Sequence, residues 1–107
     1  MAVNLEISVF ELKKLLDEKK RFLLLDCRTP VEEKIAKIAG STLVPLNEIP
    51  QKMIEFDKGK EIIVYCHHSG RSSFAATFLA RAGFKAKFLA GGIDAWAKKI
   101  DSSVALY

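Results

Sequence analysis

Cys66 has the strongest potential for chemistry in this sequence, because polar and charged residues follow it directly. The segment Cys66-His67-His68-Ser69-Gly70-Arg71-Ser72 comes after the apolar run 62–65. A free cysteine has a pKa of about 8.5, and its thiolate is the nucleophile. The charge of Arg71 and the N-terminus of a helix expected from about Ser72 would both favour that thiolate. The spacing therefore predicts a nucleophilic cysteine beside an anion-binding loop.

A second polar segment, Asp26-Cys27-Arg28, follows another apolar run at 22–25. In open α/β sheets, ligands bind outside the carboxyl ends of the strands, so both segments belong at that edge. Two interpretations of Cys27 stay open. It is either a small filler residue or a thiol that forms an internal disulfide with Cys66 and so protects Cys66 from over-oxidation.

The alternation of short apolar runs with helical patterns predicts the strands and helices that position these two polar segments. We expect strands at residues 3–7, 22–26, 43–45, 62–66 and 84–89. We expect helices after the N-caps Ser8, Thr29 and Asn47, from about 72 to a glycine cap at Gly83, and over 93–99, where Trp96 packs in the core. Such an order predicts an α/β fold with a mostly parallel sheet and helices on both faces.

Composition narrows the function classes. The chain has 107 residues, half of them hydrophobic, and a net charge of +4, which suits a single domain over residues 1–107. Its basic residues lack the interleaved aromatic residues of a nucleic-acid groove, and no apolar run is long enough to span a membrane. The two cysteines form neither a zinc motif nor a disulfide framework. We expect a cytoplasmic protein, a monomer or small homo-oligomer, without nucleic-acid or membrane partners.

Three segments in order resemble the rhodanese-like domain: residues 24–33 (LLDCRTPVEE), 65–72 (YCHHSGRS) and 89–96 (LAGGIDAW). The similarity runs from about residue 5 to residue 100. The resemblance implies a three-layer sandwich whose central sheet has about five strands. It also implies a sulfurtransferase in which Cys66 takes the outer sulfur of thiosulfate or a persulfide donor. The sulfur, held as a persulfide, then passes to a thiol or cyanide.

Site residues are also implied by this resemblance, with Cys66 as the nucleophile. The loop that holds the persulfide comprises His67, His68, Ser69, Gly70, Arg71 and Ser72. A glycine is usual three residues after the cysteine, where Ser69 stands here, so different backbone angles are expected. The adjacent histidines lack a second cluster of ligands, and we expect neither a metal nor a cofactor.

Asp26 and Arg28 match the family signature beside the active site, where they would hold the loop and help to receive anions. For Arg28 a second interpretation stays open, a surface ion pair with Glu32 or Glu33.

Two further functions remain as alternatives. The first is a persulfide relay that a partner protein feeds, in place of an enzyme acting on free thiosulfate. The second is a cysteine-based phosphatase or arsenate reductase. Four residues separate Cys66 from Arg71, whereas the related phosphatase loop has five, and the shorter loop favours sulfur transfer.

Overall fold

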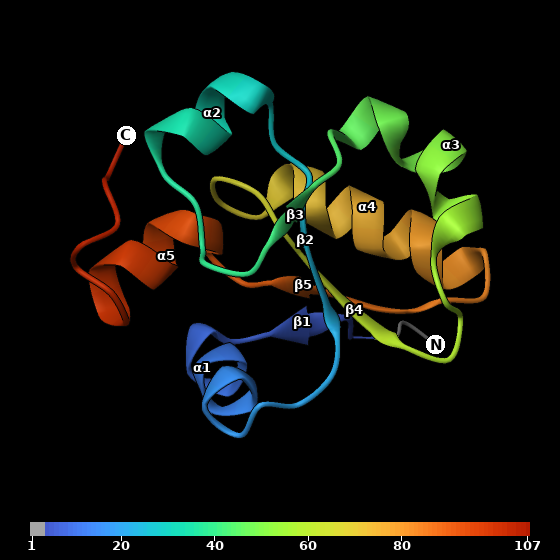
Figure 1. Cartoon of the computed structure of the whole chain (residues 1–107), viewed down its shortest axis with the longest axis horizontal. Coiled ribbons are helices and arrows are strands. Elements are labelled where there is room, and N and C mark those ends of the chain that lie inside the picture. The colour runs from blue at the N-terminus through green and yellow to red at the C-terminus, as the bar shows by residue number, and fades with distance from the viewer. Residues whose placement is uncertain (1–3) are drawn as a thin grey trace.

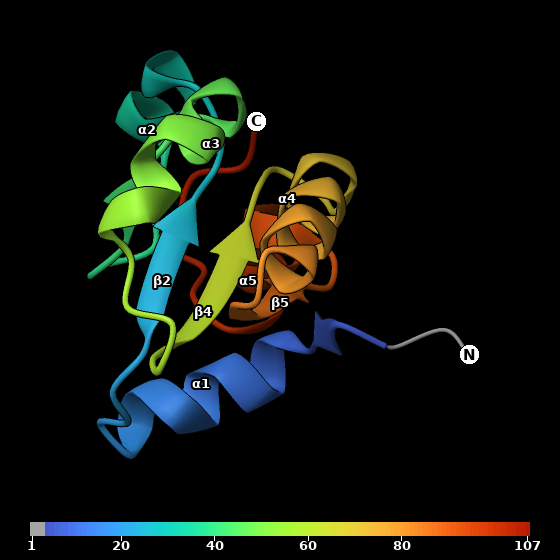
Figure 2. The ribbon, with the colours of Figure 1, turned by 90° about the vertical axis from the view of Figure 1, so that its right-hand side faces the viewer.

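The computed structural model describes residues 4–107, and its centre is a five-stranded sheet in the order β1-β5-β4-β2-β3. Every neighbouring pair of strands is parallel, as Figures 1 and 2 show. The strands are β1 (Glu6–Ile7), β2 (Leu23–Asp26), β3 (Thr42–Leu43), β4 (Glu61–Tyr65) and β5 (Lys85–Leu89). The helices are α1 (Val9–Asp17), α2 (Pro30–Ile35), α3 (Ile49–Lys52), α4 (Gly70–Arg81) and α5 (Gly92–Lys99).

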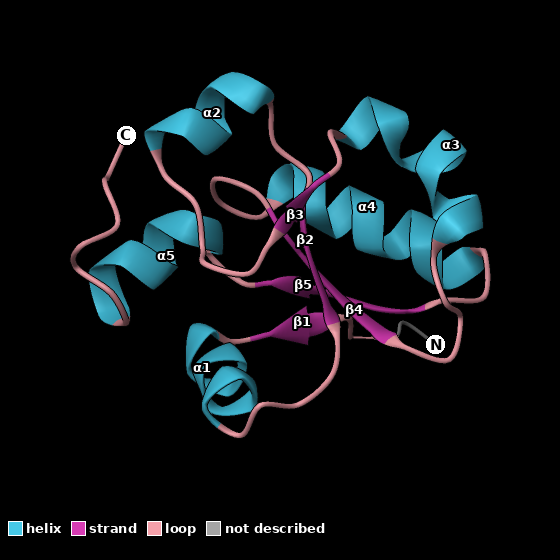
Figure 3. Cartoon of the chain, in the orientation of Figure 1, coloured by secondary structure: helices cyan, strands magenta, loops and turns pink. Residues whose placement is uncertain are grey.

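Both faces of the sheet are covered, which explains why the central strands are apolar at consecutive positions. Leu25 and Val64 point into a core shared with α4 and with Ile49 of α3. Leu24 and Ile63 point to the opposite side, into a core shared with α1 and α5. Figure 3 shows the helices distributed around the sheet. The expected three-layer α/β architecture is confirmed.

Local capping signals determine where two helices begin. Ser8 and Glu11 form a reciprocal capping box at the start of α1, and Thr29 forms one with Glu32 at the start of α2. Both N-caps were expected from the sequence. The glycine cap after α4 is also confirmed, because Gly83 has a φ of +96°, which a residue without a Cβ adopts readily. Trp96 is buried in the core, as predicted.

The expected helix after Asn47 is wrong in its form. Residues 46–55 contain a 3₁₀ turn (Leu46–Glu48), the single helical turn α3 and a second 3₁₀ turn (Met53–Glu55). Asn47 lies inside the first turn and caps nothing. Pro50 lies in the first turn of α3, where a residue without an N–H is favoured, so the α-helical turn starts there and not at Asn47.

Three other expected boundaries differ from the structure. β1 is limited to two residues, and the predicted contribution of Val3 lies outside the described residues. β3 occupies Thr42–Leu43 and stops before Pro45. α4 begins at Gly70, two residues before the predicted start. Within residues 4–107, no helix is long and apolar enough to cross a bilayer.

Candidate active site

Cys66 lies directly after β4, and its sulfur faces the first turn of α4. The backbone N–H of Ser72 donates to Cys66 Sγ at 3.4 Å, and the thiol donates to Ser72 Oγ at 3.3 Å. Ser72 is completely buried, and its hydroxyl also donates to the Ser69 carbonyl. When Cys66 ionises, this hydroxyl can turn and donate to the thiolate. The sulfur therefore lies where a helix N-terminus stabilises negative charge.

The loop before α4 leaves backbone donors free for an anion. Ser69 makes no side-chain cap for α4, and the N–H groups of Gly70 and Arg71 lie in the first turn, where no intrahelical acceptor exists. Ser69 has a φ of −143°, which any residue adopts. The serine at this position therefore needs none of the conformational freedom of a glycine.

Arg71 supplies positive charge near the sulfur but does not extend freely into solvent. Its guanidinium makes two bonds to the Glu32 carboxylate, at 2.6 and 3.0 Å. Bidentate pairing fixes the orientation of an arginine as well as its charge. The pair holds the pKa of Glu32 down at about 2, with smaller contributions from Tyr107 and Thr29. The α2 cap residue Glu32 thereby connects the start of α2 with the start of α4.

The two cysteines affect each other's ionisation strongly. A hydrogen bond from Cys27 is the largest influence on Cys66 and holds its pKa well below the usual range. The bonds from Ser72 and the charge of Arg71 act in the same direction, against the effect of burial. For Cys27, the interaction with Cys66, followed by burial, raises the pKa far above the usual range. The pair consequently favours a thiolate at Cys66 and a protonated thiol at Cys27.

The active-site loop is also held from the side of α5. Ile93 and Asp94 donate their N–H groups to the carbonyls of Cys66 and His67 at 3.0 and 3.1 Å. Gly91 donates to Ser69 Oγ at 2.9 Å. At Gly92 a Cβ atom would lie less than 3.0 Å from three carbonyl oxygens of the loop, those of Cys66, His67 and His68. Only glycine allows this close packing, as the Gly-Gly pair in the sequence indicated.

Arg28 is buried completely and is a structural residue here. All five of its N–H groups donate hydrogen bonds. Nε and Nη2 each donate to the Asp26 carboxylate at 2.8 Å. The second Nη2 hydrogen reaches the Ala36 carbonyl, and Nη1 donates to the Glu32 carbonyl and to the Tyr107 hydroxyl. No donor remains for a bound anion. The surface pair with Glu32 or Glu33 is also wrong, because the carboxylate that Arg28 meets belongs to Asp26, on the same strand end.

Comparisons with known proteins agree on one family. The family model described as "Rhodanese-like domain" matches residues 8–99. The chain belongs to the rhodanese-like domain family. It is 34% identical over 94 residues to a protein named "Sulfurtransferase" from Allochromatium vinosum, covering 87% of this chain and 88% of that one. A crystal structure of a rhodanese-related protein from Thermoplasma volcanium superimposes with a TM-score of 0.83 and 29% identity, covering 95% and 98% of the two chains.

Some relatives of this rhodanese-like domain are much longer proteins. One is named "Probable adenylyltransferase/sulfurtransferase MoeZ", from Mycobacterium tuberculosis, and is 34% identical over 104 residues. The match covers 94% of this chain but only 26% of that protein. Together, the family and the names of these relatives support sulfur transfer as the general chemistry.

The side chains of the two adjacent histidines of the rhodanese-like loop lie together. Their ring centroids are 4.1 Å apart, and the His67 ring stacks on Tyr107 at 4.0 Å. His68 faces the Asp94 carboxylate at 3.9 Å, where Lys98 also pairs at 3.0 Å. The potential ligand atoms of His67, His68 and Asp94 lie within 4.8 Å of one another. No pattern in the sequence indicated that Asp94 belongs to this cluster.

Proposed function

We propose that this rhodanese-like domain transfers a sulfane sulfur through a persulfide on Cys66. The observation that carries the proposal is the Cys66 sulfur held by the Ser72 N–H at the start of α4. A thiolate at this position combines a strong nucleophile with donors that favour negative charge. Those donors would stabilise the anionic persulfide as well as the thiolate.

The proposed reaction has two steps. The Cys66 thiolate attacks the outer sulfur of thiosulfate, a new S–S bond forms, and sulfite leaves with the electron pair of the broken S–S bond. In the second step, a thiolate or cyanide attacks the outer sulfur of the persulfide. The product is a new persulfide or thiocyanate, and the Cys66 thiolate is regenerated. Each half-reaction balances without a metal or a cofactor.

Access to the sulfur limits the first step. Cys66 is only 1% exposed, so a donor can reach it only when side chains of loop 67–71 move. A small anion with a terminal sulfur needs a smaller opening than a phosphate ester needs. The Arg71 guanidinium is already bonded twice to Glu32. The narrow access supports sulfur transfer over phosphatase activity, and the pairing of Arg71 supports it over both phosphatase and arsenate reductase activity.

A protein-fed relay is the second candidate function. It is favoured by the relative from Mycobacterium tuberculosis, in which the similar region is about a quarter of a longer adenylyltransferase/sulfurtransferase. In that function Cys66 would accept sulfur from a protein persulfide, and a small-molecule donor would be slow. The chemistry at Cys66 is the same in both candidates.

Intact mass spectrometry tests the proposal directly. The reduced protein is incubated with thiosulfate, and we expect a gain of one sulfur atom by the wild type and none by Cys66→Ser. Transfer of that sulfur to cyanide should then yield thiocyanate. Failure to gain sulfur from either thiosulfate or a persulfidated protein donor would overturn the proposal. Sulfur gain from the protein donor alone would select the relay.

A further inference from the structure

The register of β2 and β4 places Cys27 beside Cys66. Asp26 and Tyr65 are Cα partners in this parallel pair, and each cysteine is the next residue of its own strand. The Cys27 N–H donates to the Tyr65 carbonyl at 3.1 Å, so pairing continues to Cys27. Neighbouring strands lie about 4.8 Å apart, and disulfides join Cα atoms about 4.4–6.8 Å apart. The backbone spacing therefore suits a disulfide.

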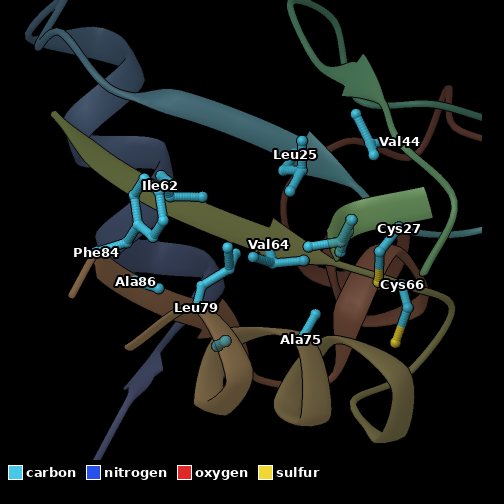
Figure 4. Close-up of a cluster of buried hydrophobic side chains, with 12 residues drawn as sticks. Leu25, Cys27, Val44, Ile62, Val64, Cys66, Ala75, Leu79, Phe84 and Ala86 are labelled. Carbon is cyan, nitrogen blue, oxygen red and sulfur yellow. The ribbon is translucent and has the colours of Figure 1, made fainter. Parts of the chain in front are cut away.

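Side-chain direction also suits this bond. Side chains alternate along a strand, so Cys27 and Cys66 point to the same face as Leu25 and Val64, two residues before them. All four belong to one buried cluster. Figure 4 shows both sulfur atoms at the same end of that cluster, beside the start of α4. Each thiol is the largest single influence on the pKa of the other. Both cysteines are free thiols in this structure.

Cys27 approaches Cys66 from inside the core. Both side chains are 1% exposed. A sulfur added to Cys66 would extend toward the loop and the N-terminus of α4, where Ser72 donates. Cys27 would then face the inner sulfur, the Sγ of Cys66 itself. Attack at the inner sulfur expels the outer one, whereas attack at the outer sulfur would move it to Cys27.

We propose that Cys27 is an internal acceptor that converts the Cys66 persulfide into a Cys27–Cys66 disulfide and releases hydrosulfide. The inference rests on the proposed function, since it starts from the persulfide. Cys27 Sγ forms a bond to Cys66 Sγ, and the S–S bond of the persulfide breaks. The departing sulfur takes that electron pair and the Cys27 proton. The sulfane sulfur is reduced by two electrons while the two cysteine thiols are oxidised to the disulfide.

A dithiol reductant completes the cycle by reducing the disulfide through thiol–disulfide exchange. Over one cycle, thiosulfate and the dithiol become sulfite, sulfide and an oxidised dithiol. The domain would thus have a second activity, reduction of thiosulfate to sulfide. An external acceptor that removes sulfur before Cys27 attacks would divert the persulfide to ordinary transfer.

In the test, thiosulfate is added to the reduced protein in the absence of a reductant, and both the intact mass of the protein and the sulfide released are measured over time. For the wild type, we expect a gain of one sulfur, then a final mass two hydrogen atoms below that of the reduced protein. One equivalent of sulfide should appear with the second change. In Cys27→Ser and Cys27→Ala, the added sulfur should remain and no sulfide should be released. Non-reducing electrophoresis separates this disulfide from one between two molecules.

The outcomes distinguish this inference from the proposed function. A wild-type persulfide that persists, with neither sulfide nor disulfide, would overturn the inference and leave sulfur transfer intact. Absence of sulfur gain in the wild type and in both Cys27 variants would instead count against thiosulfate as a donor. In that case a persulfidated protein donor loads Cys66, and the same mass and sulfide readouts decide the role of Cys27.

Discussion

The ends of β2 and β4 lie side by side, yet their polar groups are arranged in opposite ways. After β2, the Asp26 carboxylate and the Arg28 guanidinium are fully buried and bonded to each other, with every Arg28 donor used. After β4, the Cys66 sulfur receives the Ser72 N–H, and the first N–H groups of α4 have no intrahelical acceptor. The first end is satisfied internally and serves stability. The second retains donors, and we propose that it is the end that reacts.

Breaking the buried pair should give the largest effect on stability. Arg28→Met leaves the Asp26 carboxylate buried without its partner, and we expect the free energy of unfolding to fall by about 4 kcal/mol. Urea denaturation measures this change. Lys13→Met is the matched control, because the Lys13–Asp17 pair is exposed and its loss should cost about 0.5 kcal/mol.

The same variant tests the separation between the two strand ends. The double variant Asp26→Leu/Arg28→Met removes both charges and should recover much of the lost stability, since no unpaired charge remains. Where Arg28→Met is folded, Cys66 should still gain sulfur from its donor. Unchanged stability with loss of sulfur loading would place Arg28 in the chemistry and contradict the comparison.

A change at Gly92 should damage the chemical end through its packing. Ala at this position would push against the carbonyls of the Cys66 loop at a φ of +61°, and we expect a cost of about 3 kcal/mol with loss of sulfur loading. Gly40→Ala is the matched control, with a φ of +85° but no atom within 4 Å of the new Cβ. Its cost should be about 1 kcal/mol. Equal costs at both positions would mean that backbone strain, and not the loop contact, sets the effect.

Features encoded over a few residues were predictable from the sequence, and contacts across the chain were not. The Ser8 and Thr29 capping boxes each span four residues, and each is visible in the spacing alone. Cys66, Arg71 and the four loop residues between them were identified as candidates in the same way. By contrast, the carboxylate that Glu32 uses in its capping box also binds Arg71, 39 residues away, and Tyr107 reaches Arg28 over 79 residues. No local pattern indicates which of several exposed acids or tyrosines closes such a network.

Arg28 shows the same limit from another direction. The family signature that contains Arg28 was recognised from the sequence. The ion-pair partners considered for Arg28 were Glu32 and Glu33, and neither its true partner Asp26 nor its complete burial was predicted. Asp26 is two residues away, and both side chains turn into the same buried space only because β2 ends there beneath α2. Local spacing therefore identified the candidate residues, whereas the contacts formed on folding determine which charged side chains are paired in the interior.

Glu32 joins the two strand ends, and changing it should give the smallest and most specific effect. Its carboxylate binds Arg71, which lies beside Cys66, and the hydroxyl of Tyr107, which also contacts Arg28. Glu32→Gln keeps the shape but removes the charge, and we expect a loss of about 1 kcal/mol near neutral pH. Urea denaturation over a range of pH measures it. Glu33→Gln is the control.

The pH dependence separates this ion pair from simple loss of packing. Folding lowers the pKa of Glu32 from 4.5 to about 2, so its stabilisation is fully present above about pH 4.5. As the pH falls from there toward about 2, the unfolded state takes up the proton first and the stabilisation disappears. The difference between wild type and Glu32→Gln should therefore shrink on acidification. If the difference in free energy of unfolding between wild type and Glu32→Gln stays constant with pH, the packing of Glu32, and not its charge, accounts for its contribution.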